Sequence, residues 1–258
     1  MILYLHGFRS SPQSTKAALL ARAMQQRGLA DEWVCPQLPA SPAHAMALAN
    51  RLIEQACHTR HLAPASELTI MGSSLGGYYA TCLAEHWGCR AALFNPVVYA
   101  SRDLATQVGE HTLYHSNEPM TFLPEYVDEL AEMAVGKPAH PERYFLLAAT
   151  QDEVLDWREM ADWFTGCQGH VIQGSDHGIS DFEQWLPEVL DFALNPYQPL
   201  IPKCAGRRAL MEDYVRSLRR QWQFQGGKDF FAERLDPTGR VRIGQTQQNK
   251  KCQRSVQL

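Results

Sequence analysis

The sequence predicts an α/β fold, with a compact, mostly parallel β-sheet of about six strands and helices on both faces. Short apolar runs alternate with longer segments of helical periodicity through the first 195 residues. This alternation is typical of βαβ units, whose strands pair in parallel. Length and composition agree with it, because 258 residues, of which 45% are hydrophobic and 20% charged, suit a globular chain with one sizeable core.

The predicted strands are short runs rich in apolar and β-branched residues, and each is followed by a loop. They fall at Ile2–Leu5, Glu32–Cys35, Leu68–Met71, Ala91–Phe94, Tyr144–Ala148 and His170–Ile172. The predicted helices lie between and after these strands and carry apolar residues at helical spacing. They fall at 14–28, 42–58, 75–87, 156–165 and 181–194.

A stretch at about 97–142 interrupts this alternation. It holds a turn-rich piece and a helical segment near 124–135, with no clear strand. Because it follows a strand, we expect it to form a short lid insertion over the carboxyl end of the sheet. A packed surface excursion is the plainer alternative. The candidates within it for pocket lining, or equally for core packing, are Tyr114, Phe122, Leu123 and Tyr126.

Charge and proline content divide the chain near residue 195. Residues 1–195 contain 11 Lys+Arg and 23 Asp+Glu, a net charge of −12, whereas residues 196–258 contain 13 and 5, a net charge of +8. Three prolines between 195 and 202 prevent a helix from continuing there. We therefore expect an α/β domain over 1–195 and, over 196–258, a Pro-rich linker with a basic, partly helical or disordered tail. The tail could bind nucleic acid or dock on the acidic domain, although a solvated extension is the simpler interpretation.

The composition also limits the setting of the protein. No apolar run approaches the roughly 18–20 residues of a membrane-spanning helix. Met1 leads into an apolar strand without the basic segment of a secretory signal. The seven cysteines are scattered and include no CxxC pair, which favours reduced thiols over disulfides. These observations predict a cytoplasmic protein.

Gly72-Ser73-Ser74-Leu75-Gly76 lies between a predicted strand and a predicted helix. This G-x-S-x-G pattern is typical of the nucleophile elbow of α/β-hydrolases, a sharp turn that holds its central residue in a strained backbone conformation. Glycine is needed on both sides because neighbouring backbone passes too close for a Cβ atom. Ser74 is therefore the candidate nucleophile, whereas Ser73 is expected to point away from the cleft.

A serine nucleophile needs a base that is oriented by an acid, and in this fold class the acid and then the base follow the serine along the chain. Asp152 lies just after a predicted strand, where a carboxylate can orient an imidazole. Glu153 and Asp156 compete for this role, although Asp156 is better placed to cap the next helix. His177 lies in the loop after the last predicted strand, among small residues. We expect Ser74, Asp152 and His177 to form a catalytic triad.

His6-Gly7-Phe8 follows the first predicted strand. In α/β-hydrolases one backbone amide of the oxyanion hole comes from such a loop and the other from the residue after the nucleophile. That arrangement assigns the hole to the amides of Phe8 and Leu75. His6 is expected to shape the loop by hydrogen bonding to neighbouring loops, rather than to act as a second base.

Residues 1–194 resemble the YqiA/YcfP-type small bacterial α/β-hydrolases, which are described as esterases. The matching segments, in order along the chain, are LYLHGFRSSPQSTKA at 3–17, CPQLP at 35–39, MGSSLGGYYAT at 71–81, FNPVV at 94–98, DEVLDWRE at 152–159 and GSDHGISDF at 174–182. The resemblance implies an esterase-type hydrolysis and the triad of Ser74, Asp152 and His177. This chain has TQDEVLD where the family has TGDEVLD, with the aspartate retained. The resemblance does not extend to the tail over 196–258.

The leading interpretation is a serine esterase that hydrolyses a small-molecule acyl ester and needs no metal ion or organic cofactor. An acyl thioesterase is the nearest alternative, because the same residues can cleave a thioester. A catalytically silent hydrolase-fold binding module is the alternative from another class, and the complete set of three triad residues argues against it. Nucleotide-binding folds share the alternating pattern, but neither G-x-G-x-x-G nor a Walker lysine loop is present. The substrate-binding residues, the acyl-chain length and the oligomeric state stay open.

Overall fold

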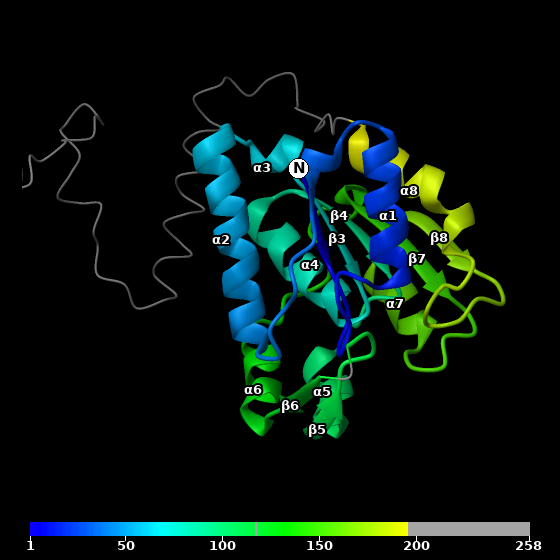
Figure 1. The fold of residues 1–258 in the computed structure, drawn as a ribbon. Coiled ribbons are helices and arrows are strands. Elements are labelled where there is room, and N and C mark those ends of the chain that lie inside the picture. Colours follow the sequence, from blue (N-terminus) through cyan, green and yellow to red (C-terminus); the bar gives the residue numbers. More distant parts are fainter. Residues whose placement is uncertain (117, 196–258) are drawn as a thin grey trace, which may run out of the picture. The chain divides into compact units, whose positions relative to one another are not determined.

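Six parallel strands form the central sheet, as the alternating pattern predicts. In the computed structural model the strands are β1 (Ile2–Leu5), β2 (Trp33–Val34), β3 (Thr69–Ser73), β4 (Arg90–Phe94), β7 (Tyr144–Ala149) and β8 (Gln168–Ile172). Their order across the sheet is β2-β1-β3-β4-β7-β8 (Figure 1). Each predicted strand is present, and its ends differ from the prediction by at most two residues.

The structure describes residues 1–116 and 118–195. The tail over 196–258 lies outside the described residues, so its linker, its helical content and its role stay predictions, as does the domain boundary near residue 195. Among the described residues, no helix is long and apolar enough to cross a membrane. The cysteines of this part of the chain are free thiols: Cys35, Cys57, Cys82, Cys89 and Cys167.

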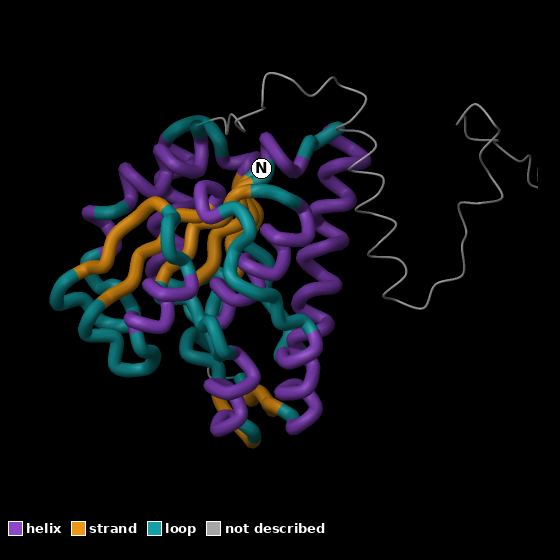
Figure 2. The backbone as a smooth tube through the Cα atoms, turned by 180° about the vertical axis from the view of Figure 1, so that it is seen from behind, coloured by secondary structure: helices purple, strands orange, loops and turns teal. Residues whose placement is uncertain are grey.

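Helices of the described part cover both faces of the sheet (Figure 1 and Figure 2). Those packed around the sheet are α1 (Thr15–Gln26), α2 (Pro42–Arg60), α3 (Pro64–Glu67), α4 (Leu75–Trp87), α7 (Trp157–Trp163) and α8 (Leu186–Leu194). Residues of α1 and α8 share one buried cluster, whereas residues of α2, α4 and α7 belong to the other. Short 3-10 helices are η1 (Ala30–Glu32), η2 (Ala105–Gln107), η3 (Pro141–Arg143) and η4 (Phe182–Gln184).

Strand β1 shows why the inner strands of the sheet are largely apolar. Successive residues of a strand point to opposite faces of the sheet. Leu3 and Leu5 accordingly belong to the cluster with α2, α4 and α7, and Ile2 and Tyr4 to the cluster with α1 and α8. A parallel sheet covered on both faces therefore buries every residue of such a strand, which is why the strands read as short apolar runs.

The last predicted helix, 181–194, is divided in the structure. The segment Phe182–Gln184 is a 3-10 helix, and the α-helix begins only at Leu186. Pro187 lies in the first turn of α8, where its missing N–H costs no helical hydrogen bond. Helical periodicity alone did not reveal this division.

The insertion at 97–142 contains two strands, so the expectation that it holds no strand is wrong. Its elements are α5 (Ala100–Leu104), β5 (Gly109–Thr112), β6 (Pro119–Phe122) and α6 (Pro124–Glu132). Strands β5 and β6 pair in an antiparallel hairpin. Figure 1 shows these elements grouped beyond one end of the sheet. The predicted helical segment near 124–135 corresponds to α6.

Candidate active site

The loops after β1 and β3 lie side by side beyond the carboxyl ends of these two neighbouring strands. Strand β2 pairs with one side of β1 and strand β3 with the other, so the sheet changes its direction of growth at this point. Crevices at such switch points, beyond the carboxyl ends of the strands, are the usual binding sites of α/β proteins. A Cβ atom on Gly7 would lie 3.1 Å from Cβ of Ser74, so the first loop lies directly against the candidate nucleophile.

The turn at Ser74 has the geometry of a nucleophile elbow. Ser74 adopts φ 55° and ψ −124°, a strained conformation for a residue with a side chain. A Cβ atom on Gly72 would lie 2.1 Å from the carbonyl oxygen of Gly76, and one on Gly76 would lie 1.9 Å from the carbonyl oxygen of Leu5. Only glycine fits at either position, as the spacing of the motif predicts.

Ser73 differs from its expected orientation. It is buried, but it lines the same pocket as Ser74 rather than pointing away from it. Its hydroxyl and that of Ser14 approach the phenol of Tyr4, whose pKa burial raises well above its usual value. Ser73 therefore belongs to the polar wall of the pocket.

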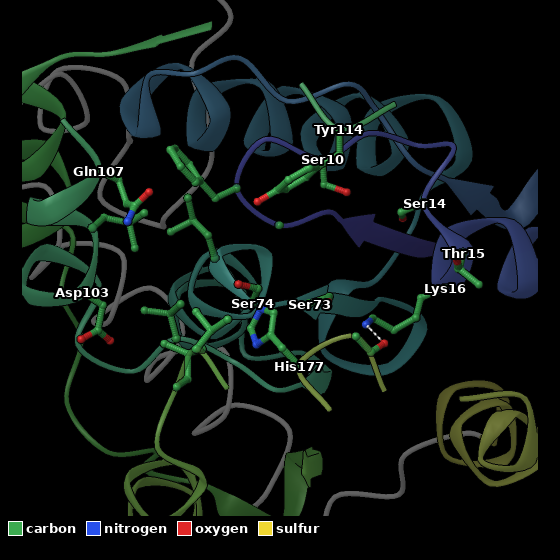
Figure 3. A pocket seen from close by; sticks show the side chains of 18 of the residues that line it. Ser10, Ser14, Thr15, Lys16, Ser73, Ser74, Asp103, Gln107, Tyr114 and His177 are labelled. Carbon is green, nitrogen blue, oxygen red and sulfur yellow. Dashed lines mark hydrogen bonds between the residues drawn. The ribbon is translucent and has the colours of Figure 1, made fainter. Parts of the chain in front are cut away.

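Asp152 and His177 are in direct contact. Nδ1 of His177 lies 2.8 Å from Oδ2 of Asp152, whose side chain is fully buried. The other carboxylate oxygen, Oδ1, accepts hydrogen bonds from the backbone amides of Val154 and Leu155, both at 2.8 Å. A carboxylate in this position holds the proton of the imidazole on Nδ1 and leaves the lone pair on Nε2. In Figure 3 the imidazole of His177 is directed toward Ser74.

The two competing carboxylates have other partners. Asp156 accepts a hydrogen bond from the amide of Arg158 at 2.9 Å and is the N-cap of α7, as expected. Glu153 accepts a hydrogen bond from the backbone amide of His177 at 3.0 Å, so it supports the loop rather than the imidazole. Of the three candidates in this segment, the structure brings Asp152 to the histidine ring.

Asn95 is a positioning residue that the sequence did not reveal. It is fully buried, with φ 43°, and follows β4 directly. Its Nδ2 donates to the carbonyl oxygens of Asp176 and His177, both at 3.0 Å, and its Oδ1 accepts from the amide of Ala149 at 2.8 Å. One buried amide therefore joins the ends of β4 and β7 to the histidine loop. The only signal in the sequence is a polar residue placed directly after an apolar strand.

The amides of Phe8 and Leu75, the predicted oxyanion hole, have no competing acceptor. Within residues 1–116 and 118–195, neither amide donates a hydrogen bond to the protein. Leu75 is also the first residue of α4, whose N-terminus favours negative charge. The amide of Leu75 and the loop that contains Phe8 thus lie beside Ser74, consistent with the predicted role.

The insertion supports the loop that contains Phe8. The ring of Phe8 packs edge-to-face against Phe122 of β6 and His111 of β5, with centroid distances of 5.2 Å and 5.3 Å. Nε of Arg9 donates to the carbonyl oxygen of Thr112 at 2.8 Å. The hairpin is therefore packed onto the first loop. Phe122 is fully buried in this contact, so of its two predicted roles it takes that of core packing.

His6 has the loop-shaping role that was expected. It is buried, and its Nε2 accepts a hydrogen bond from the amide of Leu38 at 3.0 Å. Its Nδ1 lies 3.0 Å from the carbonyl oxygen of Gly7 and donates to it. Burial lowers the pKa of His6, which favours this neutral form.

Ser74 and His177 line a pocket of about 780 Å³. Apolar residues from the N-terminus of α4, from α5 and from the loops after β4 and β7 form part of its wall: Leu75, Leu104, Val97, Val154 and Leu155. The start of α1 and the loop before it contribute polar side chains: Ser10, Ser14, Thr15 and Lys16 (Figure 3). Tyr114, a candidate from the insertion, also lines the pocket and is 64% exposed.

The sheet order and the turn at Ser74 define the protein as one with the α/β-hydrolase fold, and comparison with solved structures agrees. Est1E from Butyrivibrio proteoclasticus, with ferulic acid bound, matches with a TM-score of 0.59 at 12% identity, over 75% of this chain and 87% of that chain. The esterase domain of a Rhodothermus marinus protein matches with a TM-score of 0.53 at 18% identity, over 73% and 83% of the two chains. At these identities the likeness shows the fold.

The family follows from the sequence of residues 1–194. The family model described as Uncharacterised protein family (UPF0227) matches residues 1–194, and the chain belongs to this family. It is the YqiA/YcfP-type family, so the resemblance noted from the sequence motifs is confirmed.

Proposed function

We propose that the protein is a serine esterase in which Ser74 is the nucleophile, His177 the general base and acid, and Asp152 the group that orients the imidazole. One combination carries the proposal: Ser74, held at φ 55° in an elbow, shares a pocket with His177, which bonds the buried Asp152 at 2.8 Å. A buried carboxylate bonded to an imidazole, and a serine at a strained turn in the same pocket, are the parts that acyl transfer needs.

In the proposed reaction, Oγ of Ser74 attacks the carbonyl carbon of the ester while Nε2 of His177 takes the hydroxyl proton. The tetrahedral intermediate collapses, the C–O bond to the alcohol breaks, and His177 returns the proton to the leaving alcohol. Water then attacks the acyl-enzyme while Nε2 of His177 takes its proton. The bond to Oγ of Ser74 breaks, His177 returns the proton to Oγ, and the acid is released. Asp152 stabilises the imidazolium that forms in both halves.

The amides of Phe8 and Leu75 are proposed to bind the oxyanion. Both lack an acceptor within the described residues, and an oxyanion would supply one. Removing a single donor of this kind costs an enzyme about 3 kcal/mol of transition-state stabilisation. The N-terminus of α4 adds to this stabilisation because its dipole favours the negative charge.

The lining of the pocket suits an ester with an apolar acyl group. Leu75, Val97, Leu104 and Leu155 offer a surface to such a group next to Ser74. The volume of about 780 Å³ leaves room for an acyl group larger than acetyl. A thioester would use the same groups, so acyl thioesters belong in the substrate panel beside p-nitrophenyl esters of increasing chain length.

A fluorophosphonate probe, which labels activated serines covalently, tests the proposal. We expect the wild-type protein to be labelled on the peptide that contains Ser74, and Ser74→Ala to lose both labelling and ester hydrolysis. Ser73→Ala is the matched control, because it makes the same change at the neighbouring position, and it should still be labelled. Undiminished turnover in purified Ser74→Ala would refute the serine mechanism. No labelling of the wild type would also refute it and would favour a binding module.

A further inference from the structure

Lys16 is a buried cation in the wall of the pocket. It lies in the first turn of α1, and it is only 8% exposed. Its Nζ donates a hydrogen bond to the carbonyl oxygen of Gly178, the residue that follows His177. Figure 3 shows the side chain of Lys16 reaching from α1 toward the loop that carries His177, with this bond as a dashed line. No carboxylate of residues 1–116 or 118–195 lies within 4.0 Å of its ammonium group, so its direct partner is the carbonyl oxygen of Gly178.

This bond completes a set of contacts along the histidine loop. Asn95 holds the carbonyl oxygens of Asp176 and His177, and Lys16 holds that of Gly178. Three consecutive carbonyl groups are thus bonded by two side chains from different elements, one following β4 and the other on α1. The position of an imidazole depends on its backbone, so these contacts fix the point from which the ring of His177 extends.

We propose that Lys16 is a positioning residue for His177. The ammonium charge of Lys16 strengthens the bond to the carbonyl group of Gly178 and so keeps the imidazole of His177 directed toward Ser74. The proposal rests on the serine esterase function proposed above. A misplacement of about 1 Å in a catalytic group can cost on the order of 10²-fold in rate. A contact one residue away from the general base can therefore change kcat.

The charge of Lys16 is sensitive to pH near neutrality. Burial lowers the pKa of Lys16 to about 8, against the opposing effect of the carboxylates of Asp176 and Asp152. The other titratable groups that line the pocket are Tyr4, Arg102, Asp103, Tyr114, His115 and His177. Burial raises the pKa of Tyr4, which keeps its phenol neutral. As pH rises through about 8, Lys16 loses its proton and the bond to Gly178 loses its charge assistance. Activity should therefore decline on the alkaline side.

A direct role in substrate binding is the competing interpretation, because Lys16 lines the pocket. The two roles affect different constants. A positioning residue changes kcat for any ester, whereas a residue that binds an anionic group of the substrate changes KM, and only for esters that carry that group. The test therefore needs an uncharged ester and a carboxylate-bearing ester of similar length.

The experiment compares wild type, Lys16→Met and Lys16→Arg, with kcat and KM measured from about pH 6 to about pH 10. Methionine keeps the length and apolar stem of the side chain without the charge, and arginine keeps the charge at every pH in this range. Lys137→Met is the matched control, because Lys137 is 53% exposed and pairs with Asp162 on the surface. Melting temperature and circular dichroism identify any variant that fails to fold.

We expect Lys16→Met to lower kcat for the uncharged ester about 10- to 100-fold at neutral pH, with KM within about twofold of wild type. Lys16→Arg should keep most of the activity and lose the decline above about pH 8, and Lys137→Met should match wild type throughout. An unchanged kcat in Lys16→Met would overturn the proposal. So would a rise in KM confined to the carboxylate-bearing ester. If the variants do not fold, the wild-type profile decides, because activity that stays level up to about pH 10 contradicts a role for the charge.

The labelling experiment separates this proposal from the one on which it rests. A wild-type protein that does not react with the fluorophosphonate refutes the esterase function itself. A wild type that reacts at Ser74, together with a Lys16→Met variant that reacts at the same rate, refutes the positioning role alone. Slower labelling of Lys16→Met at the same residue supports it.

Discussion

Replacement of Asp152 by asparagine should abolish most of the activity through the tautomer of His177, with the fold left intact. Oδ1 of Asp152 accepts hydrogen bonds from the amides of Val154 and Leu155, and Oδ2 accepts one from Nδ1–H of His177, all at 2.8 Å. An asparagine has one carbonyl oxygen and one NH2 group, and the two backbone amides hold the oxygen on their side. The NH2 group then faces Nδ1 and donates to it. The imidazole must carry its proton on Nε2, the nitrogen that would otherwise take the proton of Ser74.

The expected loss follows from this tautomer. An imidazole protonated on Nε2 cannot act as the general base, and the same change in a serine protease lowers kcat about 10⁴-fold. At about 1.36 kcal/mol for each factor of ten, this corresponds to about 5.4 kcal/mol of barrier. The melting temperature should change little, because asparagine has the shape of aspartate and keeps the two backbone hydrogen bonds.

The assay is kcat for a short acyl ester, measured for Asp152→Asn beside Asp156→Asn and Glu153→Gln. The two controls remove neighbouring carboxylates that bond backbone amides, those of Arg158 and His177, at 2.9 Å and 3.0 Å. They should lose no more than about tenfold in kcat, since neither touches the ring. The reasoning fails if Asp152→Asn keeps kcat within about tenfold of wild type, or if Asp156→Asn proves the more damaging change.

Three further predictions concern two residues that support the site and the tail over 196–258. Asn95→Ala leaves two carbonyl groups and one amide buried without this partner. It should cost about 1–3 kcal/mol of folding free energy, measured by urea titration, and its effect on the reaction should be a fall in kcat with little change in KM. Phe122→Ala removes the ring that packs on Phe8, and it should cost about 3–5 kcal/mol of stability and lower kcat through the oxyanion loop; activity close to wild type would show that the hairpin is dispensable. A chain ended at Asn195 retains every residue of the proposed site and should fold and hydrolyse short esters at rates close to full length. A large loss of melting temperature or activity on truncation would show that the tail belongs to the enzyme.

The sequence predicted the central sheet well because its inner strands β1, β3, β4 and β7 are buried on both faces. Such strands carry mostly apolar residues, and in β4, for example, Ala91 to Phe94 form a buried apolar run. The hairpin of the insertion was missed for the opposite reason. Strand β5, Gly109–Thr112, alternates half-buried and exposed residues over only four positions and contains Gly, Glu and His, so it has neither the length nor the composition of a predicted strand.

The site shows the same division between local and distant causes. The elbow at Ser74 was predictable because the glycine spacing is a local consequence of the turn. Asn95 and Lys16 were not, because each acts on a segment far away in the chain. Asn95 bonds Asp176 across 81 positions, and Lys16 bonds Gly178 across 162. No local pattern records such contacts, since they depend on which loops the sheet order brings together.

The loops that carry the proposed chemistry are each held by a different part of the fold, and this makes their contributions separable. The loop of Phe8 packs on the hairpin of the insertion through Phe122, whereas the loop of His177 is held by Asn95 and Lys16. Changes to the hairpin should therefore weaken oxyanion stabilisation and leave the pH dependence of kcat unchanged, because no proton moves there. Changes at Lys16 should alter the alkaline side of the pH profile, because the charge that holds the histidine loop is lost there. In a Phe122→Ala, Lys16→Met double variant, the fold-loss in kcat should therefore equal the product of the two single fold-losses. The reason is that one contact supports the loop that stabilises the oxyanion and the other supports the loop that carries the general base. A double loss no larger than the greater single loss would show that both contacts hold one common structure.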